Sequence, residues 1–190
     1  GSAAAYIIIG AYGNKTAHAP RISANGKVAD ALYLYNQQYW EICDLDISNN
    51  VEGTKMVAGD TNPTGNVTKR NNEEGSKLGD YRGIHIAGRD VATLQGYYIH
   101  NVRVHDVSGI VSWIGNTGKY EPGIGNNYGY DASKRTGGIL IEAIAPTGNT
   151  SINGQPTVFS NITIEDSEFV NNSFCGITIK QYNNGKNQNN

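Results

Sequence analysis

The sequence is poor in cysteine, methionine and charged residues, and it contains no long apolar run. Its two cysteines, Cys43 and Cys175, are too few for a disulfide framework and show no metal-binding spacing. No apolar run approaches the length needed to span a bilayer, and no basic stripe accompanies the net charge of −2. We therefore expect no metal site, no membrane partner and no nucleic-acid partner. We also expect two free thiols, because the repeats described below place the cysteines in the first and fourth coils, about 14 Å apart along the stack, whereas a disulfide spans a Cα distance of at most about 7 Å. The start, GSAAAYIII, lacks the basic residues and the long apolar stretch of a signal peptide.

Helix-forming patterns are also missing. Leucine is scarce, and no window shows a sustained apolar period of 3.6 residues, so we expect almost no helix. Isoleucine and valine supply most of the aliphatic content, which favours strands. The 190 residues include 24 glycines and 12 tyrosines against 3 phenylalanines, a balance typical of turns and wet contact surfaces. The composition predicts an all-β protein with one domain over 1–190, ending in a polar tail at 183–190.

One eight-residue phrase occurs three times. It runs apolar, any, Asp or Asn, apolar, any, apolar, any, Asp or Asn, and its copies are ICDLDISN (42–49), IHNVRVHD (99–106) and FSNITIED (159–166). The third position holds Asp44, Asn101 and Asn161. Aspartate and asparagine tolerate left-handed backbone and bond their own chain, so each copy predicts a corner between two short strands.

A second phrase lies between the copies of the first. It starts with alanine or glycine and then alternates apolar and outward residues, as in ALYLY (31–35), GIHIA (83–87), GILIE (138–142) and GITIK (176–180). This alternation is typical of half-buried strands. Repeated strand pairs indicate a solenoid, in which each coil packs on its neighbours. A β-sandwich would also show alternating strands, but it would not need the same phrase in every unit.

These phrases resemble a known group. The stretches NITIEDSEF, NVRVHDVSG and YIIIGAYGN, the later PRISANG and the GIxI strands are similar to those of right-handed parallel β-helix proteins of the pectate-lyase-like superfamily. The resemblance runs from about Tyr6 to Tyr182 and is specific for the fold rather than for the reaction. It implies a right-handed parallel β-helix and an extracellular, secreted protein. It also implies carbohydrate chemistry, since the superfamily consists mostly of polysaccharide lyases and glycoside hydrolases, with some epimerases and phage tailspikes.

The spacing of the phrases predicts long inserted loops, at 50–81, 88–96, 111–136 and 143–157. Long loops concentrated on a rigid stack favour the walls of a cleft. No amphipathic helix caps either end, which favours a fragment of a longer protein or one chain of several.

Alignment of the phrases predicts neighbours, because equivalent residues on successive parallel strands lie about 4.8 Å apart. The second phrase gives the outward columns Tyr33–His85–Leu140–Thr178 and Tyr35–Ala87–Glu142–Lys180. The first phrase gives Asp46–Arg103–Thr163 and Ser48–His105–Glu165. The predicted contacts between charged residues are Asp46–Arg103, His105–Glu165 and Glu142–Lys180. Each pair also fits an ordinary surface ladder of opposite charges, which needs no function.

The candidate catalytic cluster is Glu142 beside Lys180 and near His85. In a hydrolase, Glu142 would act as acid or base with Asp131 or Glu165 as its partner. A lyase would instead use a base such as Lys180, His85 or Arg103 and a cation that neutralises a uronate. Candidate substrate-binding residues are aromatic rings suited to sugar faces and arginines near the predicted strands: Trp113, Tyr120, Tyr128, Tyr130, Arg82, Arg103 and Arg135.

Three classes of function therefore remain open. The leading one is cleavage of a polysaccharide or oligosaccharide, with hydrolysis favoured over lyase chemistry because the near-neutral charge does not point to a strongly acidic substrate. Hydrolysis requires no cofactor. A lyase would be compatible with calcium, although no dense carboxylate run of the DxDxDG type is present. The other classes are a non-catalytic carbohydrate-binding or adhesin-like solenoid and a purely structural fragment.

Overall fold

The computed structural model describes residues 1–13, 19–50, 81–108, 136–144 and 157–180, and this part of the chain is all-β. Its twelve strands are β1 (Ile7–Gly10), β2 (Arg21–Ser23), β3 (Asp30–Tyr35), β4 (Trp40–Cys43), β5 (Asp46–Asn49), β6 (Arg82–Gly88), β7 (Thr93–His100), β8 (Arg103–Val107), β9 (Gly137–Ala143), β10 (Val158–Glu165), β11 (Glu168–Val170) and β12 (Ile177–Lys180). No helix among the described residues is long and apolar enough to cross a membrane.

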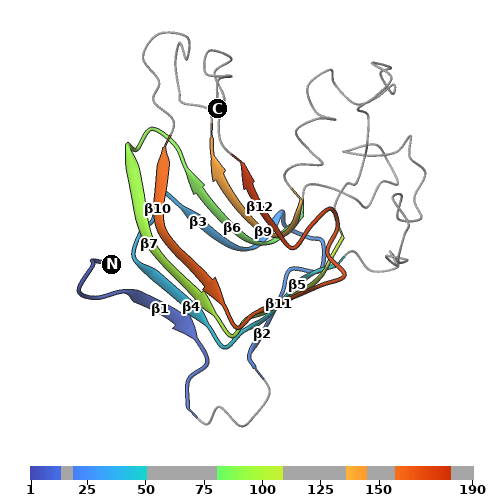
Figure 1. Cartoon of the computed structure of the whole chain (residues 1–190). Helices are drawn as coiled ribbons and strands as arrows, with labels where there is room; N and C mark the ends of the chain where they lie inside the picture. Colours follow the sequence, from blue (N-terminus) through green and yellow to red (C-terminus); the bar gives the residue numbers. More distant parts are fainter. Residues whose placement is uncertain (14–18, 51–80, 109–135, 145–156, 181–190) are drawn as a thin grey trace, which may run out of the picture.

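The strands form three four-stranded sheets, and every pairing between these strands is parallel. We name each sheet by its first strand: the β1 sheet (β1-β4-β7-β10), the β2 sheet (β2-β5-β8-β11) and the β3 sheet (β3-β6-β9-β12). The described chain therefore visits the three sheets in the same order four times, and Figure 1 shows the strands of each sheet side by side. We call each set of three successive strands a layer. The predicted all-β class with parallel strands is confirmed.

The core lies between the three sheets and is built from columns of aliphatic side chains. Ile42, Ile47, Ile84, Ile99 and Ile139 are fully buried in it. In the β3 sheet, residues of successive strands face one another in one column of the core: Leu32, Ile84, Ile139 and Ile177. This register matches the predicted alignment of the second phrase. The last layer is less covered, since Ile177 and Ile179 of β12 are 40% and 74% exposed. β-Branched residues at alternate positions thus bury one face of each strand in a shared core.

In the second and third layers, the corner between the first two strands uses left-handed backbone, as the third position of the first phrase predicted. Asp44 and Asn101 have φ of 56° and 50°. Their side chains stack from layer to layer, with Asn101 Nδ2 donating to Asp44 Oδ1 at 2.5 Å. These residues therefore support one another in a conformation that most L-residues avoid.

The third copy of the phrase is not FSNITIED, so that alignment is wrong. Strand β10 pairs with β7 so that Ile164 faces Ile99 and Glu165 faces His100, and the corner residue is Asp166, with φ of 47°. The structural copy is therefore IEDSEFVN (164–171), displaced by five residues. Asn161 also has positive φ, but it lies within β10, opposite the stretch of β7 that contains Gly96.

Two further expectations differ from the structure. The segment 88–96 holds no long loop, because β6 ends at Gly88 and β7 begins at Thr93. The outward positions of β6 and β9 are not exposed: His85 and Glu142 are each 3% exposed, so these two strands are buried on both faces.

The other three expected loops, over 50–81, 111–136 and 143–157, and the polar tail lie almost entirely outside the described residues. The absence of a disulfide between Cys43 and Cys175 is confirmed.

Candidate functional site

Charged side chains cross the whole outer face of the β3 sheet. The residues are Asp30 on β3, Arg82 and His85 on β6, Glu142 on β9 and Lys180 on β12, and we call them the charged cluster. His85 lies between two carboxylates, with Nδ1 3.2 Å from Asp30 Oδ1 and Nε2 3.3 Å from Glu142 Oε2. Lys180 Nζ lies 3.3 Å from the other oxygen of Glu142, and Arg82 Nε donates to Asp30. Each strand of the sheet thus contributes to one alternating row of acids and bases.

The register of the β3 sheet explains why these side chains meet. His85 faces Leu140 on the next strand, and Ala87, two residues later, faces Glu142. Alanine leaves room on β6, so the Glu142 carboxylate reaches across to the imidazole of His85. Glu142 in turn faces Lys180, which confirms the predicted neighbours. Asp30 was missed by the sequence reasoning, because it lies at the very start of β3, before the alternating phrase begins.

The cluster is largely shielded from solvent. The side chains of Arg82, His85 and Glu142 are 6%, 4% and 3% exposed, and that of Asp30 is 14% exposed. Burial raises the pKa of the Asp30 carboxyl, but the close contact with His85 and the hydrogen bond from Arg82 outweigh burial and hold that pKa below its ordinary value. The contacts of His85 with the two carboxylates are close in distance but poorly aligned as hydrogen bonds. Neither ring nitrogen has a well-aligned hydrogen-bond partner among the described residues, so His85 is held by close contacts with the two carboxylates and by its packing.

Two tyrosines extend the cluster to the surface. Tyr33 stacks on His85 with ring centroids 4.8 Å apart, and Tyr35 lies 6.0 Å from Tyr33. Both belong to β3, the edge strand of the sheet, and they are 46% and 41% exposed. Burial of part of the ring, together with the negative charge of Asp30, raises the pKa of Tyr33, so its hydroxyl stays protonated. The pair offers apolar ring faces beside polar hydroxyls at the border of the charged cluster.

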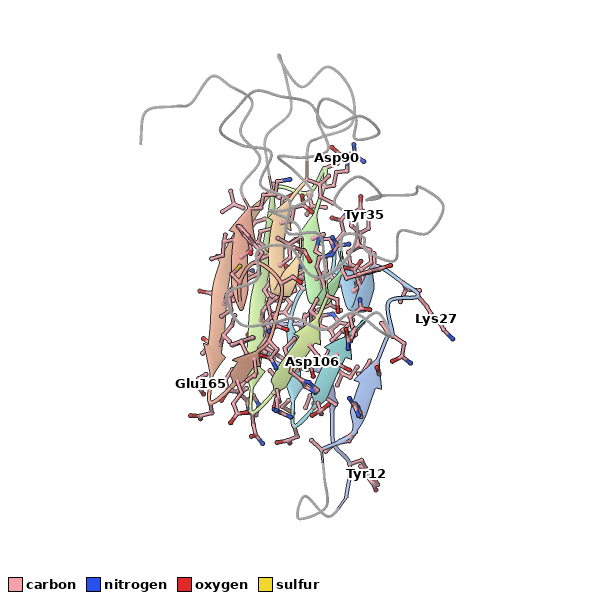
Figure 2. All side chains as sticks on the ribbon, turned by 90° about the vertical axis from the view of Figure 1, so that its right-hand side faces the viewer. Tyr12, Lys27, Tyr35, Asp90, Asp106 and Glu165 are labelled. Atoms are coloured by element: carbon pink, nitrogen blue, oxygen red, sulfur yellow. The ribbon has the colours of Figure 1, made fainter. Side chains whose placement is uncertain are left out.

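Glu165 and Arg103 lie on the other two sheets. Glu165 ends β10 of the β1 sheet, where Tyr98 donates a hydrogen bond of 2.5 Å to it and the pKa of Tyr98 rises to about 12. Figure 2 places Glu165 far from Tyr35, which lies at the edge of the β3 sheet. Arg103 lies in the β2 sheet, 3.8 Å from Asp46, and this confirms the predicted contact. Neither residue is a partner of Glu142 in the described structure.

The predicted contact between His105 and Glu165 is wrong, for the same reason as the displaced third phrase. His105 faces Val170, not Glu165, in the neighbouring strand. Its imidazole instead bridges two aspartates, with Nε2 2.9 Å from Asp46 and Nδ1 2.6 Å from Asp106. This second group of charges is compensated by Arg21 and Arg103 around Asp46, which indicates a stabilising surface network.

The remaining predicted site residues lie outside the described residues. They are Asp131, Trp113, Tyr120, Tyr128, Tyr130 and Arg135. Of the predicted residues that the structure describes, His85, Glu142, Lys180 and Arg82 come together in one cluster.

One potential set of metal ligands was missed by the sequence reasoning. Glu41, Cys43 and His100 place one potential ligand atom each within 4.8 Å of one another on the β1 sheet. A signal was present, since Cys43 and His100 both occupy the second position of the first phrase, and Glu41 precedes Cys43 by two residues on the same face of the strand.

Comparison of the chain with protein-family models, with curated proteins and with solved structures finds no match. The resemblance to pectate-lyase-like proteins therefore stays a prediction from the sequence motifs.

Proposed function

We propose that the protein is a right-handed parallel β-helix that binds a polysaccharide on the outer face of the β3 sheet and hydrolyses it at the charged cluster. The fold proposal is supported by the four passages of the chain through three parallel sheets in one order, together with the repeated phrases. The handedness, and the location of the protein outside the cell, come from the resemblance and are part of the proposal.

The observation that carries the proposed hydrolysis is the pair of carboxylates held on either side of His85. Asp30 and Glu142 belong to strands two apart in the sheet, and the His85 ring lies between their carboxylates, 3.2 Å from Asp30 Oδ1 and 3.3 Å from Glu142 Oε2. Inverting glycoside hydrolases hold their two carboxyl groups about 6.5–9.5 Å apart, to admit a water molecule beside the sugar. Two carboxylates separated by one imidazole ring and its two contacts support the inverting arrangement.

The two carboxylates have different surroundings and would take different roles. Asp30 is kept ionised by His85 and Arg82 and is the candidate base that activates water. Glu142, with Oε2 3.3 Å from His85 Nε2, is the candidate acid for the leaving oxygen. Tyr33 and Tyr35 would hold the sugar by stacking against the exposed part of their rings.

A non-catalytic carbohydrate-binding role is the second candidate, and one observation favours it. Every charged group of the cluster already contacts a group of opposite charge, and the aromatic side chains are the more accessible part of this face. In this alternative the charges only stiffen the sheet. Lyase chemistry has less support, because Lys180 and Arg103, two of the candidate bases, both contact carboxylates. It is the alternative to which a calcium requirement would belong, whereas hydrolysis calls for no cofactor.

The experiment that tests the proposal is incubation of the full chain with a panel of neutral and acidic polysaccharides. Reducing ends and the absorbance of unsaturated uronates are measured together, and binding is measured by affinity electrophoresis. The variants are Asp30→Asn and Glu142→Gln in the cluster, and Tyr35→Ala at the surface. The matched control is Glu168→Gln, since Glu168 is exposed and pairs with Arg103 on another sheet.

We expect reducing ends without unsaturated product, a loss of about 100-fold or more in Asp30→Asn and Glu142→Gln, and unchanged activity in Glu168→Gln. Circular dichroism establishes that each variant is folded. Unsaturated product would replace hydrolysis by a lyase reaction. Binding that is weakened by Tyr35→Ala, with no product from any polysaccharide, would establish the binding role and refute catalysis.

A further inference from the structure

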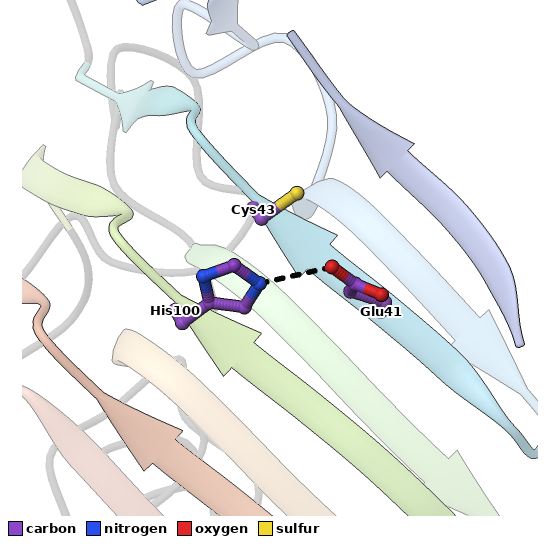
Figure 3. A group of neighbouring side chains, drawn as sticks. All are labelled: Glu41, Cys43 and His100. Carbon is purple, nitrogen blue, oxygen red and sulfur yellow. Dashed lines mark hydrogen bonds and ion pairs between the residues drawn. The ribbon is translucent and has the colours of Figure 1, made fainter.

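The outer face of the β1 sheet carries a thiol, an imidazole and a carboxylate in one small group. Glu41 Oε1 lies 3.0 Å from His100 Nε2, and the ligand atoms of Glu41, Cys43 and His100 all lie within 4.8 Å of one another. Figure 3 shows Glu41 and Cys43 on β4 and His100 on the neighbouring strand β7, with the imidazole directed at the carboxylate. This group lies on a different sheet from the charged cluster.

Strand geometry places the three side chains on the same face. Ile42 is fully buried in the core, so its neighbours Glu41 and Cys43 point to the opposite side of β4. The parallel register sets Cys43 directly beside His100. In the preceding layer the same column holds Gly10, where a side chain would come within 2.7 Å of Cys43 Sγ. The glycine therefore leaves the space that the sulfur occupies.

A neighbouring aromatic ring holds the imidazole in place. Tyr98 stacks on His100 with ring centroids 4.2 Å apart, and its hydroxyl donates to Glu165, the residue that faces His100 in the next layer. His100 is thus oriented by a ring on its own strand, which is itself anchored to a third strand. Such support around a ligand is typical of metal sites, where ligand orientation controls affinity.

We propose that Glu41, Cys43 and His100 form a binding site for zinc. Thiolate, imidazole and carboxylate are the ligand types that zinc accepts, and three protein ligands leave one position open. The thiolate favours zinc over the hard cations calcium and magnesium, which take oxygen ligands. The side chains of Glu41 and His100 are 26% and 23% exposed, so an ion can reach the site, and the open position would take water or a small anionic ligand.

The spacing requires only a small adjustment on binding. Zinc–ligand distances of about 2.0–2.3 Å at tetrahedral angles place neighbouring ligand atoms roughly 3.5 Å apart. The three atoms lie within 4.8 Å of one another before binding, and the contact of Glu41 with His100 is already at 3.0 Å. Closing around an ion therefore requires shifts of the ligand atoms of only about 1 Å.

The test is titration of the full chain, first stripped with a chelator, with Zn²⁺ and separately with Co²⁺. Zinc binding is measured by calorimetry. Cobalt binding is measured by absorption, because a thiolate ligand produces a sulfur-to-cobalt charge-transfer band in the near ultraviolet. The variants are Cys43→Ser, Glu41→Gln and His100→Gln, and the matched control is Cys175→Ser, at the other cysteine of the chain.

We expect one zinc ion per chain, a charge-transfer band that disappears in Cys43→Ser and persists in Cys175→Ser, and an affinity about tenfold or more weaker in Glu41→Gln and His100→Gln. Thermal unfolding of each variant without metal establishes that the fold is retained. If Cys43→Ser does not fold, the zinc affinity of Glu41→Gln, at a partly exposed position, still tests the proposal. The proposal is overturned if the wild-type chain gives no thiolate band. It is also overturned if the band follows Cys175, or if Glu41→Gln and His100→Gln bind zinc as tightly as the wild type.

Discussion

Two isoleucines in the same column provide the sharpest test of how the layers stack. Ile141 on β9 faces Ile179 on β12, and both belong to the GIxI phrase. Ile141 is 1% exposed and has strands on both sides, whereas Ile179 is 74% exposed on the edge strand of the β3 sheet. The same substitution, Ile→Ala, should therefore have very different effects on the free energy of unfolding at the two positions.

The magnitudes follow from burial. The substitution removes three carbon groups, each of which contributes about 0.8 kcal/mol when buried, so the transfer loss at Ile141 is about 2.4 kcal/mol. The cavity left among fixed neighbours adds to this, and we expect a total of about 3–4 kcal/mol, within the usual range for buried Ile→Ala changes. At Ile179 only about a quarter of the side chain is shielded, so the expected loss is about 0.6 kcal/mol.

The assay is urea-induced unfolding of the wild type, Ile141→Ala and Ile179→Ala, followed by circular dichroism and by tyrosine fluorescence. Coincident transitions from both probes justify a comparison of free energies. A loss of more than 2 kcal/mol at Ile179 would show that this side chain is buried, and would refute the exposure given to it here. Equal small losses at both positions would refute the assignment of Ile141 to the core.

Two further predictions concern polar groups. Replacement of Asp30 by Asn should destabilise the protein by roughly 3 kcal/mol at neutral pH, because His85 and Arg82 lose a shielded counter-charge. The pKa of Asp30 is lower in the folded state, so its contribution to the free energy of unfolding is fully present above the unfolded pKa of about 4. This contribution is lost as pH falls through the folded pKa. Unfolding measured across pH should therefore show the stabilities of the wild type and the variant converging in acid. Replacement of Asn49, fully buried and bonded to four backbone groups, by Ala should cost about 2–4 kcal/mol in urea unfolding. The exposed Gln37→Ala is its control, with an expected change below about 0.5 kcal/mol; a change of similar size in both variants would contradict the role given to Asn49.

The β3 sheet was predictable because its signal is local. The second phrase begins with a small residue and alternates strictly, so its four copies align without ambiguity, and the column from Tyr35 through Glu142 to Lys180 follows from a period of two. The corner residues were likewise visible as Asp44 and Asn101, because few residues adopt left-handed backbone.

The third copy of the first phrase was not predictable in this way. The structural copy, IEDSEFVN, has Ser167 where Leu45 and Val102 fill the corner of the earlier layers, and it therefore breaks the pattern at its fourth position. FSNITIED satisfies the pattern but lies mostly inside one long strand, β10. Pairing along the whole of β7 decides between them, and this is a property of two strands more than 60 residues apart.

What the sequence by itself determined is therefore the strand content, the repeated corner and the order of residues along each strand, since these depend on backbone preferences and on a period of two. Only the tertiary structure decided which layers lie in register and which polar side chains are shielded. It brought Asp30 to His85 from a strand end outside the phrase, and Glu41 to His100 across 59 residues of sequence. The physical reason is that hydrogen bonds between parallel strands, and not the local pattern, fix which residues become neighbours.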